Sequence, residues 1–252
     1  MEVHAHTHTP RKKWNHYFWE FFMLFLAVTL GFFVENQREH YIEHKREKDY
    51  IRLFIQDLKT DTVFFNQANS ANKANQGRMD SLMNLLQLYK PGAPTEELYY
   101  LARTITSKGI SIQYTNRTFE QLKGSGGFRL IRKSDVLDSI TLYYESLKDL
   151  DIRVSHRFER LSDLFRITEE LFDGWALNEI AEAEFTRPVK TPSLVTNDRI
   201  ILNKYVTRLG YFKATDLRII ERIEQAFLPS AVNLINMIKK EYHLSEGAPL
   251  EE

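Results

Sequence analysis

The longest run of apolar residues lies near the N-terminus, where positions 21–34 read FFMLFLAVTLGFFV and carry no charge. Counted from Trp14, the apolar segment is 21 residues long. As an α-helix it would extend about 31 Å, close to the roughly 30 Å hydrocarbon thickness of a bilayer. Trp14 and Trp19 at its start are typical of a membrane interface, where we expect them to contact lipid or a partner. The pattern predicts a transmembrane anchor over residues 14–34.

Two other structures share part of this pattern. A cleaved signal peptide also joins basic residues to a short apolar core, but no pair of small residues follows Val34. A buried helix of a soluble protein would have to hide nine aromatic residues. We therefore expect an uncleaved single-pass anchor. The basic residues 11–13 favour a cytoplasmic N-terminus and a periplasmic C-terminal domain, although the five basic residues between positions 38 and 52 oppose that orientation.

A charged helix is predicted to follow the anchor. Residues 35–52 hold five acidic and five basic side chains and neither glycine nor proline, so helix propensity is high and no breaker marks the membrane exit. We predict a solvated stalk helix over 35–56. The apolar spacing of a packed helix sets in around Ile51, and we place a bundle domain at 57–244.

Further along the chain, stripes of apolar residues at helical spacing alternate with short breaker segments, which predicts an all-α bundle. In the polar stretch 66–78 the first helix could be interrupted. Asn116 is expected to cap a short helix. After residue 197 we expect two helices, of which the last, over 215–244, is kinked or broken at Pro229.

The clearest periodic signal lies between residues 137 and 172. Apolar residues recur there at alternating spacings of three and four, and nine of 11 such positions are apolar, with Asp151 and Thr168 as the exceptions. This coiled-coil-like seam predicts one helix on the order of 50 Å long. It also gives the protein a surface for association with a second copy of itself.

Composition narrows the possible functions. The 10 glycines and 7 prolines are few, which favours long helices over a β-sandwich. The 34 basic and 34 acidic side chains give a net charge of zero, which argues against nucleic-acid binding through bulk charge. Without cysteine there is no thiol nucleophile, disulfide or thiolate metal site. No complete catalytic signature is present, so we expect neither an enzyme nor a cofactor.

One histidine pair has the spacing of a metal site. His40, Glu43 and His44 match the H-x-x-E-H order of the inverted zinc peptidases. They lie in the solvated stalk, however, where no pocket would shield a metal-bound water. A charged helix with two histidines is the simpler interpretation, and a weak metal or pH-responsive contact is a third.

The first 13 residues contain three more candidate metal ligands, His4, His6 and His8. Three imidazoles so close together can bind Zn²⁺, Ni²⁺ or Cu²⁺ loosely, but a flexible leader supplies no supporting hydrogen bonds to the ligands. We expect a flexible leader over 1–13, with metal binding as the alternative. At the other end, the polar residues 245–252 predict a disordered tail.

Two further features suggest contacts. The Gly-Ser-Gly-Gly stretch at 124–127 adjoins Arg129, Arg132 and Lys133. It resembles a phosphate-binding turn but lacks the P-loop spacing, so a helix terminator is the simpler interpretation and a small anionic ligand the alternative. Glu20 lies inside the apolar segment, where an ionisable group either reaches the membrane interface or pairs with another membrane helix.

The leader, anchor and stalk together resemble an uncharacterised family of small bacterial membrane-anchored proteins. The matching features are the His-rich leader, the basic pair, the aromatic anchor ending in Gly-Phe-Phe, and an Asp-Leu-Lys-x-Asp stretch, here Asp57 to Asp61. A second match is TFEQLKGSGGFRLI, Thr118 to Ile131. The resemblance implies a Gram-negative inner-membrane setting and a helical extramembrane domain. It implies no catalytic residues.

These observations lead to three functional hypotheses. The first is a membrane-anchored helical subunit for interaction or assembly, with a second copy or other membrane proteins as partners. The second is a membrane-anchored sensor of a small anionic ligand at Arg129, Arg132 and Lys133. The third is a metal-dependent hydrolase at His40, Glu43 and His44.

Overall fold

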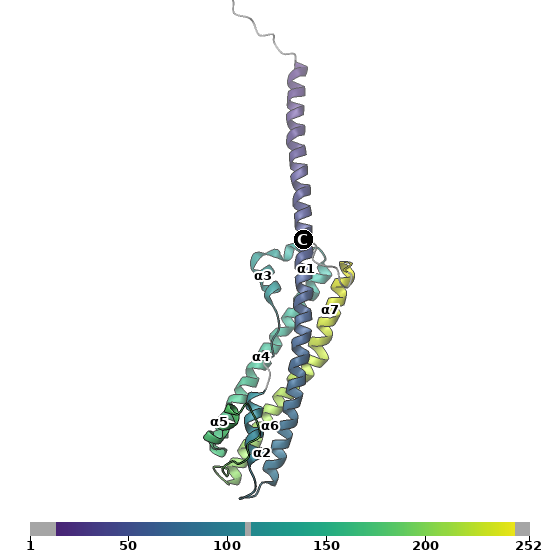
Figure 1. The fold of residues 1–252 in the computed structure, drawn as a ribbon. Coiled ribbons are helices and arrows are strands. Elements are labelled where there is room, and N and C mark those ends of the chain that lie inside the picture. The colour runs from purple at the N-terminus through teal and green to yellow at the C-terminus, as the bar shows by residue number, and fades with distance from the viewer. Residues whose placement is uncertain (1–13, 109–111, 245–252) are drawn as a thin grey trace, which may run out of the picture. The chain divides into compact units, whose positions relative to one another are not determined.

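The structure is a computed structural model that describes residues 14–108 and 112–244. These residues form helices and connecting loops, without a strand, so the predicted all-α class is confirmed. The predicted leader and tail, with His4, His6 and His8, lie outside the described residues. The elements are α1 (Trp14–Leu88), α2 (Glu96–Ser107), α3 (Arg117–Ser125), η1 (Gly127–Leu130), α4 (Ser134–Leu171), α5 (Gly174–Glu182), α6 (Arg199–Arg222), η2 (Ile223–Phe227) and α7 (Leu228–Glu241) (Figure 1).

The chain divides into two compact units, residues 1–49 and residues 50–252. In the first unit the described residues belong to α1. The second unit is a helical bundle whose first fully buried residue is Ile51. The bundle core therefore begins before residue 57, because Ile51, Phe54 and Ile55 already belong to it.

Helix α1 continues without interruption from Trp14 to Leu88, so the expectation of a break within residues 66–78 is wrong. That stretch has no proline, and its polar side chains do not interrupt the backbone hydrogen bonds of a helix. Asn69, Asn72 and Asn75 recur every third residue and are buried. Packing of that face against the rest of the bundle holds the segment helical.

The bundle contains two separate apolar cores. The first joins α1 up to Ala68 to α3, the N-terminal half of α4, and the rod formed by the end of α6, η2 and α7. The second joins α1 from Met79 onward to α2, the C-terminal half of α4, α5 and the N-terminal half of α6. Three long elements, α1, α4 and the α6–α7 rod, thus contribute to both cores.

Helix α4 confirms the predicted long helix but corrects its buried face. One predicted row of positions, containing Ile140 and Leu147, is buried or partly buried. The other row, however, leaves Phe158 at 51% and Phe165 at 46% exposure. The neighbouring row with Arg157 and Leu164 is buried instead. Both rows are mostly apolar, so spacing alone did not distinguish them.

The C-terminal part of the chain is one continuous helical rod of 43 residues over 199–241, rather than two helices. Asp198 caps its start by accepting a hydrogen bond from the Ile200 N–H. Pro229 neither breaks the rod nor leaves it regular. The π-helical turn η2, at Ile223–Phe227, ends two residues before Pro229 and accommodates the proline ring and its missing N–H.

Candidate functional site

The apolar segment of α1 is the first candidate site. Its most apolar stretch has a mean hydropathy of 1.9, and none of that stretch is buried. The helix is therefore long and apolar enough to cross a membrane, a property that a signal sequence near the N-terminus shares. Trp14 is 86% exposed and Trp19 is also exposed. Glu20 Oε1 lies 3.1 Å from Nε2 of His16, one turn earlier on the helix.

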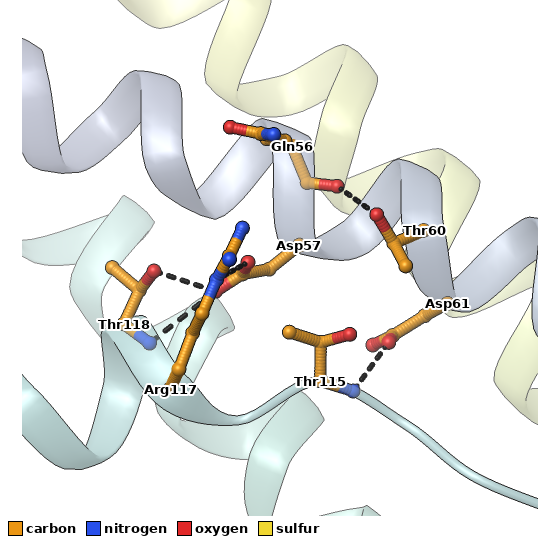
Figure 2. A network of polar contacts seen from close by, with 7 residues as sticks. All are labelled: Gln56, Asp57, Thr60, Asp61, Thr115, Arg117 and Thr118. Carbon is orange, nitrogen blue, oxygen red and sulfur yellow. Dashed lines mark hydrogen bonds and ion pairs between the residues drawn. The ribbon is translucent and has the colours of Figure 1, made fainter.

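The second candidate is a pair of buried aspartates on α1, Asp57 and Asp61, both 0% exposed. They lie one helical turn apart and contact the segment that leads into α3 (Figure 2). We call this network the aspartate clasp. It consists of the two aspartates and the four residues that donate to them, Thr115, Arg117, Thr118 and Tyr143.

Asp57 acts as the N-cap of α3 from a distant part of the chain. Its Oδ2 accepts hydrogen bonds from the Thr118 N–H at 3.3 Å and the Thr118 hydroxyl at 2.5 Å. Its Oδ1 accepts from Arg117 Nε at 2.8 Å. Asn116, the expected cap, precedes α3 but makes no capping hydrogen bond with its side chain. A carboxylate at a helix N-terminus also interacts favourably with the helix dipole.

Asp61 fixes the loop before α3 and one face of α4. Its Oδ1 accepts from the Thr115 N–H at 2.6 Å, and its Oδ2 accepts from the Tyr143 hydroxyl at 2.9 Å. Burial raises the pKa of Asp61 to about 6, although these hydrogen bonds act in the opposite direction. Burial and then the charge of Asp61 raise the pKa of the Tyr143 and Tyr144 hydroxyls.

The clasp has the chemistry of a structural joint. Paired carboxylates can act as general acid and base only where a substrate reaches them. Here both carboxyl groups are fully buried and accept hydrogen bonds from residues of the chain itself. The sequence signal for this joint was two aspartates at i and i+4, on a face that otherwise buries Phe54, Leu58 and Phe65.

The stalk histidines are not part of a metal cluster in the structure. His44 Nδ1 lies 3.3 Å from Glu47 Oε2, and His40 is exposed on the preceding turn. Within residues 14–108 and 112–244, no three histidine, aspartate or glutamate side chains gather closely enough to hold a metal ion. The described geometry therefore gives the H-x-x-E-H spacing no support as a hydrolase centre.

The three predicted anion ligands follow the glycine-rich turn. Gly126 adopts the left-handed conformation, with φ of 66°, and ends α3 as a C-cap. Arg129 and Arg132 are exposed. Lys133 Nζ contacts the Glu241 carbonyl oxygen and lies 3.3 Å from Glu241 Oε2 at the end of α7. The Lys133 ammonium therefore joins α7 to the start of α4, and the turn itself terminates a helix.

Surface hollows mark two further places on the bundle. A hollow of about 450 Å³ between α1 and α6 is lined by Met83, Leu202 and Asn203 among others. A second hollow, of about 470 Å³, lies between α4 and α7 and includes Tyr143 of the clasp and Ser230. Neither contains His40, His44, Arg129, Arg132 or Lys133.

Comparison with known proteins assigns no family to the chain: no family model, no curated protein and no solved structure matches it. Within the chain itself, the Asp-Leu-Lys-x-Asp stretch at 57–61 contacts the segment 118–131. Asp57 accepts hydrogen bonds from the N–H and the hydroxyl of Thr118, the first residue of that segment.

Proposed function

We propose that the protein is a single-pass protein of a bacterial inner membrane that acts as an interaction or assembly subunit. The observation that carries the proposal is the unburied, aromatic-rich helical segment over residues 14–34. So large an apolar surface is costly in water and is stabilised by a bilayer. In this proposal the N-terminus is cytoplasmic, the bundle is periplasmic, and the role is non-enzymatic and independent of nucleic acid or a cofactor.

The bundle surface supports a protein partner, for which we propose a second copy of the chain. Phe158 and Phe165 lie seven residues apart on α4 and are each about half exposed. Large apolar side chains grouped on one helix are typical of an association surface. Glu20, inside the apolar segment, adds a polar group through which two anchors can pair.

Site-specific photo-crosslinking in native membranes tests this proposal. A photoreactive residue placed at Phe158 or Phe165 is expected to give a crosslinked product of twice the chain mass. The same group placed at Gln67, an exposed polar position on α1, is the matched control and should give much less. A chain that stays uncrosslinked from both phenylalanine positions would contradict self-association. Products with another membrane protein would keep the interaction role and change the partner.

Protease treatment of spheroplasts tests the sidedness separately. With the proposed orientation, added protease digests the bundle in spheroplasts and leaves it intact in whole cells. Protection in both preparations, with digestion only after lysis, would place the bundle in the cytoplasm and reverse the orientation.

A further inference from the structure

A layer of polar residues separates the two apolar cores of the bundle. On α1 the first core ends at Ala68 and the second begins at Met79. The same change occurs on α4 between Leu150 and Leu164, and on the α6–α7 rod between Ile219 and Phe212. In each gap the helix buries polar side chains. We call this set the polar layer; its members are Asn69, Asn72 and Asn75 of α1, Arg157 of α4 and Asp216 of α6.

Part of the polar layer is paired. Arg157 Nε lies 2.5 Å from Asp216 Oδ1, and its guanidinium lies over the Phe212 ring, 5.2 Å from the centroid. Asn75 donates from Nδ2 to the Ile105 carbonyl oxygen at 3.1 Å and accepts from Arg78 at 3.3 Å. These contacts hold α4 to α6, and α1 to α2.

Four polar atoms of the layer find no partner among the described residues. Both amide atoms of Asn69, the Oδ1 of Asn72 and the Oδ2 of Asp216 are buried without a hydrogen bond to the protein. Asn72 and Asp216 are each 1% exposed. A buried polar atom without a hydrogen bond is costly, and natural proteins satisfy such atoms with internal water. The layer also interrupts the continuous apolar packing that makes a bundle unfold as one unit.

Polar contacts also join α1 to the rod within and next to the layer. The π-helical turn η2 begins about two turns after Asp216 along the rod, inside the first core, to which its Ile223 and Phe227 belong. Lys73 of α1 pairs with Glu224 inside this turn, and Gln76 donates to the Lys213 carbonyl oxygen of α6 at 2.9 Å. Gln76 thus adds a polar contact between α1 and the rod within the layer, whereas Lys73 and Glu224 pair at the surface.

We propose that the polar layer admits internal water and divides the bundle into two halves that open separately. One half contains the aspartate clasp and α7, and the other contains α2 and α5. Asn69, Asn72 and Asp216 are the residues that bind the water. The inference concerns the bundle alone and stands whether or not the protein is an assembly subunit.

Hydrogen–deuterium exchange of the full chain in detergent micelles tests this. Amides of residues 69–76 on α1 and around Arg157 on α4 should exchange about tenfold faster than amides of the same helices within either core. Replacing Asn72 with Leu joins the two cores and should slow exchange across the layer. Asn66→Leu is the matched control, because Asn66 is exposed on the same helix, and it should leave the exchange of the layer unchanged.

The exchange profile of the unsubstituted chain decides the matter even where the Asn72 variant fails to fold. Uniform protection from Phe54 through Leu86 on α1, with a single cooperative opening of both cores, would overturn the proposal. An Asn72→Leu variant that folds and exchanges as fast as the unsubstituted chain across the layer would also overturn it.

Discussion

Asp57 on α1 caps α3, accepting hydrogen bonds from the backbone N–H and the hydroxyl of Thr118, 61 positions further along the chain. The contact fixes where α3 begins, and therefore where the glycine-rich turn and the start of α4 lie. Together with Asp61 it ties the first helix of the bundle to the segment between α2 and α4. The clasp is thus a long-range joint inside the first core.

Removing the cap should destabilise the bundle. Asp57→Ala leaves the Thr118 N–H without its acceptor, and we expect a loss of ~2 kcal/mol in the free energy of unfolding. The Arg117 pair adds little to this, because Arg117 is largely exposed. Urea denaturation followed by circular dichroism measures the effect. Asp138→Ala, at an exposed aspartate of α4, is the control and should change stability by less than about 0.5 kcal/mol.

The stability of the bundle should depend on pH through Asp61. The pKa of this carboxyl is about 6 in the folded protein, against an ordinary value of 3.8. A raised pKa means that the folded state holds the proton more tightly. The resulting stabilisation is complete below about pH 4 and is lost as the pH rises through 6. Between pH 4 and 7 the chain should therefore lose up to ~3 kcal/mol from this group.

Asp61→Asn should remove that dependence, because the amide does not titrate. Urea denaturation at pH 4.5 and pH 7.5 compares the two chains. If the difference in stability between the two pH values is the same in Asp61→Asn as in the unsubstituted chain, Asp61 is not the titrating group.

The Tyr143 hydroxyl should matter more when Asp61 is charged. It donates to Asp61 Oδ2 at 2.9 Å, and this hydrogen bond lowers the pKa of Asp61 against the effect of burial. Tyr143→Phe should therefore cost more stability at pH 7.5 than at pH 4.5, by about 1 kcal/mol. Equal losses at the two pH values would show that the hydroxyl does not stabilise the carboxylate.

Replacing each of the three glycines of the turn with alanine should change the stability of the chain by a different amount. Gly124 is helical with open space around it, so Gly124→Ala should stabilise the chain by about 0.5–1 kcal/mol. Gly126 has a positive φ of 66°, and Gly126→Ala should destabilise it by about 1 kcal/mol. At Gly127 a new Cβ would lie 2.5 Å from Leu122 Cδ2, so its alanine variant should also be destabilised. Thermal unfolding ranks the three. Equal effects would contradict the turn's role as a helix terminator.

Much of the fold could be predicted from the periodicity of apolar residues. The all-α class, the long helix α4 and the end of α3 at Gly126 follow from local pattern. The buried face of α4 does not, because the rows containing Phe158 and Leu164 are equally apolar. Tertiary packing decides between them: the row with Leu164 lies in the two apolar cores, and Arg157 of that row pairs with the buried Asp216.

The candidate site was less accessible to sequence reasoning. Asp57 and Asp61 were visible only as part of a matching stretch, since their partners lie more than 50 positions away. Polar composition is the usual mark of a loop, so residues 66–78 predict an interruption of the helix, although the asparagines among them are buried in the bundle. A row at every third position, Asn69, Asn72 and Asn75, was the signal that they share one helix face.

The most direct test of the proposed function is whether residues 14–34 remain in the mature protein and hold it in the membrane. Membranes from cells that express the untagged chain are washed at high pH, and the retained protein is analysed by intact mass. We predict a membrane-retained protein whose mass includes residues 14–34. A soluble product that begins after Val34 would show that the segment is a cleaved signal sequence and would contradict the proposal.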